Sequence, residues 1–155
     1  MYLDTDTNVI IHDKKEIKGM RKAGILAAKV LDFITPHVVP GCTTEYLDKK
    51  CHEYILKNNA IPAPLNYRGF PKSICTSINH VICHGIPSEK KLKDGDIINI
   101  DITVILNGWH GDTSRMFWIG NPKIKAKKLT ETTYEAMWKG IKQVKPGNTI
   151  GDIGF

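Results

Sequence analysis

Residues 99–117 read NIDITVILNGWHGDTSRMF, and this stretch decides the fold. Asn107-Gly108 is the strongest local signal for a β-hairpin, because both residues tolerate the positive φ angles of a two-residue type I′ turn. Apolar residues alternate on the two sides of the turn and supply the strands. A hairpin closed on this turn pairs Asp101 with Ser114.

The hairpin carries two carboxylates within its strands, although Asp is among the poorest strand formers. Asp112 falls opposite Thr103, so it shares a face with Asp101 and is its diagonal neighbour, at about 7 Å between backbones. Carboxylates this close either repel, so that one retains a proton, or share a divalent cation. His110, nearer the turn on the same face, is a candidate further ligand. The opposite face is predicted to be buried and carries Ile98, Ile100, Ile102, Val104 and Leu106.

Spacing alone leaves two interpretations of this face open. An ordinary polar sheet surface also accommodates the two carboxylates beside Thr103 and Ser114. A metal site needs about four to six donors, and the two carboxylates do not complete such a set. Under the metal-site interpretation, further ligands must come from elsewhere.

Length and composition are typical of a single globular domain of 155 residues, with 41% hydrophobic and 25% charged residues. No apolar run approaches the roughly 20 residues of a membrane helix. The first twelve residues contain two Asp and no Lys or Arg, unlike a signal peptide, so we expect a cytoplasmic protein with no membrane partner. The four cysteines form no C-x-x-C motif, which favours reduced thiols over disulfides or structural zinc.

The net charge is +6, and the lysines cluster. Such an excess favours polyanionic partners, including ribosomal RNA, although solvated helix faces and loops explain it equally well. No aromatic residue is interleaved with the clusters, so the sequence gives no sign of base stacking. The clusters are Lys14, Lys15, Lys18, Arg21 and Lys22; Lys90, Lys91 and Lys93; and Lys123, Lys125, Lys127 and Lys128.

Two helices are predicted in the first part of the chain, after a loosely held extension over residues 1–12. Asp13 and Glu16 match a capping box that opens a helix of about 20 residues. Its apolar positions recur at helical spacing, at Ile17, Met20, Gly24, Ala27, Leu31 and Ile34. A second helix begins after Thr43 or Thr44 and closes at Asn58-Asn59, with Leu47, Cys51, Tyr54 and Ile55 on its inner face.

The rest of the chain is predicted as loop, strand and helix in turn. Residues 61–72 contain three Pro and one Gly and form an ordered loop. Short strands are expected over 74–78 and 81–83, then a turn at 94–96 and the hairpin. A third helix spans about 126–144, with Leu129, Thr133, Ala136, Met137, Ile141 and Val144 on one side. Thr149 is the expected N-cap of a fourth helix, and the sequence ends about one turn into it. A helix of one turn is not stable alone, so we expect this sequence to be the front part of a longer polypeptide.

Three blocks resemble the signature segments of type I methionine aminopeptidases, in the bacterial form without an N-terminal zinc-finger extension. They read YRGFPKSICTSINHVICHGIP (67–87), KLKDGDIINIDITVI (91–105) and GWHGDTSRMF (108–117). The resemblance runs from about residue 13 to the end. It implies an α+β pita-bread fold, as in creatinase and the aminopeptidases: an antiparallel sheet with helices on its outer face, in two pseudo-symmetric halves. This chain would then cover an extension over 1–12 and, over 13–155, roughly the first half of the catalytic domain and the start of the second.

The resemblance also implies an activity: removal of the initiator methionine from nascent proteins by dinuclear-metal-assisted hydrolysis, with a small second residue preferred. It assigns Asp101 and Asp112 as metal ligands, for two divalent ions drawn from Co, Mn, Fe, Zn and Ni. His84 matches the histidine that contacts the scissile amide. The methionine pocket falls on Tyr67, Phe70 and Cys75.

The family's other ligands, one His and two Glu, have no counterpart in these 155 residues, so we expect the chain alone to bind metal poorly and to be inactive. Phe70 and Pro64 depart from the commonest family residues without losing apolar character. Expected partners are nascent polypeptide N-termini and the ribosome, with no DNA, for a monomeric enzyme. The alternatives are a proline-specific peptidase of the same fold, or a non-catalytic protein that binds ribosome or RNA through its lysines.

Overall fold

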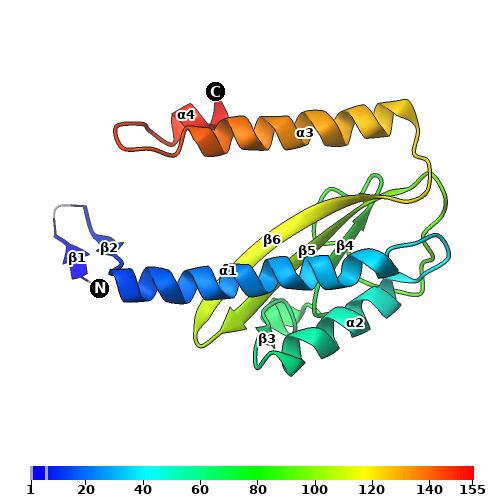
Figure 1. Cartoon of the computed structure of the whole chain (residues 1–155), viewed down its shortest axis with the longest axis horizontal. Helices are drawn as coiled ribbons and strands as arrows, with labels where there is room; N and C mark the ends of the chain where they lie inside the picture. The colour runs from blue at the N-terminus through cyan, green and yellow to red at the C-terminus, as the bar shows by residue number, and fades with distance from the viewer. Residues whose placement is uncertain (1, 6) are drawn as a thin grey trace.

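The computed structural model describes residues 2–5 and 7–155 and contains one main sheet with helices (Figure 1). The helices are α1 (Lys14–Ile34), α2 (Thr44–Lys57), α3 (Ile124–Lys142) and α4 (Gly151–Gly154), with 3₁₀ turns η1 (Thr35–His37) and η2 (Tyr67–Gly69). The strands are β1 (Tyr2–Asp4), β2 (Val9–Ile11), β3 (Ile61–Pro62), β4 (Cys75–Ile78), β5 (Ile97–Leu106) and β6 (Trp109–Trp118).

The central hairpin has the predicted register. β5 and β6 pair antiparallel from Ile97↔Trp118 to Leu106↔Trp109, closed by Asn107 and Gly108, which both have positive φ. β5 is the middle strand: β6 lies on one of its edges, and β3 and β4 pair with it on the other. The hairpin is therefore the frame on which the rest of the sheet assembles.

The helices α1 and α2 bury one face of this sheet. α1 begins with the predicted capping box, and α2 is capped by Thr43 at its start and Asn58 at its end, also as predicted. The predicted buried face of β5 is confirmed for its four branched residues, while Leu106 at the hairpin end is only partly buried. The largest fully buried side chains are Val30, Leu31, Ile34, Leu47, Ile55, Ile74, Leu92, Ile98, Ile100, Ile102, Val104 and Ile119.

Two glycines let α1 lie directly on β6. A Cβ on Gly111 would collide with the backbone of Ala23 and Gly24, so strand and helix touch main chain to main chain. Trp109 precedes Gly111 by two residues on β6, and its indole ring occupies the place where a side chain on Gly19 would be. Because helix axes ordinarily stand off from a sheet by the length of their side chains, this contact fixes the position of α1 over the hairpin.

Residues 81–83 are not a strand, so that prediction was wrong. The chain turns at Asn79, and His84 has a left-handed backbone with φ 54°. Ile82 between them is 94% exposed. These two positive φ values interrupt an extended ladder, which requires negative φ throughout.

The two ends of the chain pack less than its centre. Ile17 and Met20 lie on the expected apolar side of α1 but are exposed, because burial on α1 begins at Ala23. α3 stands apart from the sheet in Figure 1, and Thr130 is its one buried residue. Trp118 donates a hydrogen bond to Thr130 Oγ1 (2.9 Å) and ties α3 to the end of β6.

Short elements occupy both termini. β1 and β2 pair with each other over residues 2–4 and 9–11. Near the C-terminus, Asp152 accepts hydrogen bonds from the backbone N and hydroxyl of Thr149, and the four-residue α4 follows. All four cysteines are free thiols, as predicted. Among the described residues, no helix is both long and apolar enough to cross a bilayer.

The contact at Gly111 predicts a large effect for a small substitution. Gly111→Ala should lower the free energy of unfolding by about 1–3 kcal/mol, because the added methyl has no space between β6 and α1. Gly24→Ala is the matched control, since its added Cβ meets nothing within 4 Å. In the helix interior that change should stabilise by about 0.5–1 kcal/mol. Urea unfolding followed by circular dichroism measures both; similar effects of the two variants would contradict the close contact.

Candidate metal centre and substrate pocket

A hollow of about 830 Å³ opens on the sheet face opposite α1. Its floor comes from β4, β5 and β6, and its walls come from the 63–71 loop and the segment that follows His84. All six residues predicted for the site line it, together with eight others. The full lining is Ala63, Pro64, Tyr67, Arg68, Gly69, Phe70, Pro71, Cys75, His84, Ile86, Asp101, Thr103, His110 and Asp112.

Two carboxylates from adjacent strands meet on the floor of this hollow. Asp101 pairs with Ser114 and Thr103 with Asp112, which makes Asp101 and Asp112 diagonal neighbours as predicted. Burial raises the pKa of Asp101, and the charge of Asp112 and a hydrogen bond with its carboxyl raise it further. The pair is therefore strained by mutual repulsion when both groups are ionised.

A tight contact with β4 presents His84 at the edge of the hollow. Thr76 N donates to Gly85 O (2.8 Å), and Gly85 N donates to Ser77 Oγ (3.2 Å). A Cβ on Gly85 would collide with the carbonyl of Thr76, so only glycine permits this approach. The imidazole of His84 is near enough to Asp101 to oppose the rise in that carboxyl's pKa.

The loop that carries Tyr67 and Phe70 is closed on itself. Asn66 N donates to Phe70 O (2.8 Å) and Phe70 N to Tyr67 O (3.0 Å). Asn66, Arg68 and Gly69 all have positive φ, an uncommon conformation for an arginine. The hydrogen bonds that hold these angles keep both aromatic residues along the wall of the hollow.

The end of this loop is anchored to α2. Asp48, buried on α2, accepts hydrogen bonds from Ser73 N (2.8 Å) and Ile74 N (3.1 Å). Burial raises the pKa of Asp48, and these two hydrogen bonds oppose the rise. His52 Nδ1 is hydrogen-bonded to Ser73 Oγ (2.7 Å), and Lys72 pairs with Glu45. The anchor gives the loop a fixed exit into β4.

Cys75 forms an apolar part of the floor. It is 7% exposed and pairs with Asp101 across β4 and β5. Burial, and then the nearby Asp101 carboxylate, raise the pKa of its thiol to about 11. Cys75 therefore stays a neutral thiol near pH 7, with a soft and polarisable sulfur that suits contact with another sulfur.

The sequence did not single out Arg68 and Ile86 as pocket residues. Arg68 reaches the hollow through its left-handed backbone, and a sequence carries no direct signal for that in an arginine. Ile86 is two residues from His84, in a segment for which the sequence predicted no regular structure. His110 lines the hollow as expected of a residue on the same face as Asp112.

The Asp101 and Asp112 carboxylates are the type of ligand that a divalent cation prefers, but two ligands are too few to hold one. Paired carboxylates are hard oxygen ligands, and a cation between Asp101 and Asp112 would remove their repulsion. Within residues 2–5 and 7–155, however, no group of three or more His, Cys, Asp and Glu side chains is arranged to hold a metal ion. Asp101 and Asp112 would hold the metal from this side, and His110 does not complete a ligand set with them.

Comparison with known proteins shows the family of this chain. The family model of metallopeptidase family M24 matches residues 18–155, and the chain belongs to that family. The methionine aminopeptidase of Rickettsia prowazekii (strain Madrid E) is 63% identical over 145 residues, which are 94% of this chain and 56% of that protein. The chain thus spans little more than half the length of this relative.

Solved structures show the same architecture. The crystal structure of methionine aminopeptidase from Rickettsia prowazekii superposes with a TM-score of 0.93 at 62% identity and covers 94% of this chain and 59% of its own. The prolidase from Pyrococcus furiosus, at 24% identity and a TM-score of 0.79, shares the fold over 93% of this chain and 41% of its own. The fold is the pita-bread fold that the sequence predicted, seen here in part.

Removing one carboxylate of the pair should stabilise the metal-free chain. The pKa of Asp101 is raised in the folded state, so the folded state binds more protons than the unfolded state above the ordinary Asp pKa. Stability therefore falls as pH rises through that window and is lowest, for this pair, when both groups are ionised. Asp101→Asn should raise stability at pH 7 by about 1 kcal/mol, or about 3 °C in Tm.

Thermal unfolding at pH 5 and pH 7 in EDTA measures this effect. Asp32→Asn is the matched control, because it removes an exposed carboxylate that pairs with Arg115 (2.9 Å) and should slightly lower Tm. A loss of stability in Asp101→Asn at pH 7 would show that the two carboxyl groups do not repel.

Proposed function

We propose that this chain supplies the N-terminal part of a methionine aminopeptidase that removes the initiator methionine from nascent proteins. One observation carries the proposal: Asp101, Asp112 and His84 line the same hollow as Tyr67, Phe70 and Cys75. The resemblance in sequence assigns the first three to chemistry and the other three to the methionine side chain. The high identity to named methionine aminopeptidases supports the same substrate class.

Each residue has a role that its surroundings allow. Asp101 and Asp112 would hold two divalent ions, which polarise the scissile carbonyl and supply a hydroxide when bound. His84 stands at the rim and can donate a hydrogen bond to the amide as it becomes tetrahedral. Tyr67, Phe70 and Cys75 enclose an apolar space for a thioether. Metal number and identity, among Co, Mn, Fe, Zn and Ni, stay predictions.

Two carboxylates do not complete such a centre, so we propose that its other ligands lie in polypeptide outside these 155 residues. This agrees with the 56% share of the Rickettsia prowazekii relative that the chain spans. A glutamate from that part would act as the general base. Preference for a small second residue, a monomeric state, a cytoplasmic location and work near the ribosome belong to the same proposal.

A proline-specific peptidase is the second candidate for this hollow, because prolidases share the fold. The two functions differ in the peptide that is cleaved, so hydrolysis of Met-Ala-Ser against an Xaa-Pro dipeptide separates them. The third candidate is a protein with no catalysis. A carboxylate pair that repels without a metal favours metal-dependent chemistry over that alternative.

The proposal predicts different outcomes for the chain and for its extended gene product. The 155-residue chain should release no methionine from Met-Ala-Ser in Mn²⁺ or Co²⁺. The polypeptide extended along its reading frame to the length of its relatives should release it. In that extended protein, His84→Ala should lower kcat by about 100-fold, because a transition-state hydrogen bond is lost.

His80→Ala is the matched control, since His80 is exposed and lies outside the lining of the hollow. It should leave kcat unchanged. Free methionine measured by a coupled oxidase assay gives the rates. Methionine release by the 155-residue chain itself would overturn the proposed division of ligands, and cleavage of Xaa-Pro alone by the extended protein would overturn the proposed substrate.

A further inference from the structure

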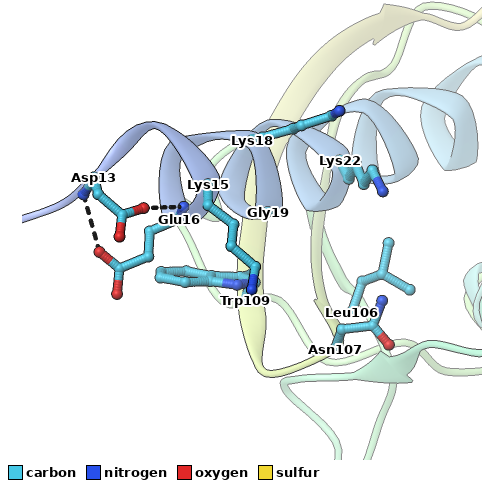
Figure 2. A pocket seen from close by; sticks show the side chains of 9 residues that line it. All are labelled: Asp13, Lys15, Glu16, Lys18, Gly19, Lys22, Leu106, Asn107 and Trp109. Carbon is cyan, nitrogen blue, oxygen red and sulfur yellow. Dashed lines mark hydrogen bonds between the residues drawn. The ribbon is translucent and has the colours of Figure 1, made fainter. Parts of the chain in front are cut away.

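A second hollow lies on the other side of the hairpin, between the start of α1 and the hairpin end (Figure 2). Its volume is about 590 Å³. We name it the lysine groove. Its lining comes from two segments far apart in sequence and consists of Asp13, Lys15, Glu16, Lys18, Gly19, Lys22, Leu106, Asn107 and Trp109.

The groove carries three lysines that have no acidic partner among the described residues. Lys15, Lys18 and Lys22 follow one another at spacings of three and four residues, so they lie on one side of α1. None of them forms an ion pair within the part of the chain that the structure describes. They belong to the first lysine cluster, and Lys15 lies in the first turn of α1, where the helix start adds further positive potential.

The two acids of the groove are already engaged at the start of α1. The Asp13 carboxylate accepts a hydrogen bond from Glu16 N (2.8 Å), and the Glu16 carboxylate accepts one from Asp13 N (3.0 Å). These bonds lower the pKa of both carboxyls. Figure 2 shows both carboxyl groups turned toward the helix start, whereas Lys22 and Asn107 lie beyond the other end of the indole ring.

An aromatic ring also lines the groove. The indole of Trp109 lies against Gly19, where any side chain would displace it, and meets the edge of His12 with ring centroids 5.5 Å apart. Trp109 remains partly exposed toward the groove. Leu106 beside it is apolar, and the Asn107 amide adds a donor and an acceptor. The fold therefore places an aromatic ring beside lysines that no aromatic accompanies in sequence.

We propose that the lysine groove binds a single-stranded nucleic acid, with phosphates at the lysines and a base against Trp109. From Lys15 to Lys22 the helix rises about 10 Å at about 1.5 Å per residue. Each of the three ammonium groups stands on a long, flexible side chain and can contact one phosphate of a strand that follows the helix. Base–aromatic stacking together with a cationic row is the usual sequence-tolerant mode of single-strand binding.

The groove is separate from the candidate metal centre, because the two hollows share no lining residue. Nucleic-acid binding at the lysine groove therefore does not depend on the peptidase activity. RNA and DNA strands offer the same phosphates and bases, and the groove shows no contact that would select a 2′-hydroxyl.

Fluorescence anisotropy of the 155-residue chain with labelled rU and dT octamers tests the proposal. Three phosphate contacts predict a slope of about −2 for log K against log salt, so binding should weaken about 20-fold between 50 and 200 mM NaCl. The variant K15Q/K18Q/K22Q should lose at least about 10-fold in affinity at 50 mM NaCl. The matched control K90Q/K91Q/K93Q changes the net charge equally in another cluster and should bind like the wild type.

Tryptophan fluorescence tests the stacking contact separately. A saturating octamer should quench the wild-type emission, and Trp109→Phe, which keeps a ring against Gly19, should abolish most of the quench while the chain stays folded by circular dichroism. Three results would overturn the proposal: no octamer binding at 50 mM NaCl, equal loss in the two triple variants, or displacement of the octamer by inorganic phosphate at equal phosphate concentration. The last would reveal a general anion site.

Discussion

The register of the β5–β6 hairpin is the constraint on which the structure depends. The Asn107-Gly108 turn accepts two positive φ angles and thereby fixes which residues of β5 and β6 face one another. A slip of one residue would move Asp101 or Asp112 to the opposite face and place a carboxylate in the core. The same turn thus determines both the core of the domain and the meeting of its two carboxylates.

Alternation along β6 then separates two kinds of surface. Asp112 and His110 face the candidate metal centre, while Trp109 and Gly111, one residue away in each case, face α1. Further along, Arg115 also faces α1 and hydrogen-bonds Asp32 and Thr35. Because neighbouring residues on a strand point in opposite directions, β6 carries the site on one side and the helix contact on the other.

Local patterns allowed most of this arrangement to be predicted, and close contacts between distant segments explain what was missed. The capping box of Asp13 and Glu16, the hairpin register and the pairing of the carboxylates follow from residue spacing. The left-handed backbone of His84 and the docking of Gly85 on β4 do not, because they depend on a neighbour that the sequence does not name. That is why residues 81–83 were predicted wrongly as a strand.

The lysine groove is a second feature that local sequence patterns did not predict, because it depends on contact between distant segments. The first lysine cluster contains no aromatic residue, and base stacking was therefore not predicted from the sequence. Gly19 and Gly111 remove the side chains that would hold α1 away from β6, so the helix comes close enough for its lysines and Trp109 to line one groove. The lysine groove therefore forms because Gly19 and Gly111 lack side chains, and the residues of the lysine cluster alone do not indicate it. The carboxylate pair is the opposite case. Its meeting could be predicted from residue spacing, although the described residues place no third metal ligand beside it.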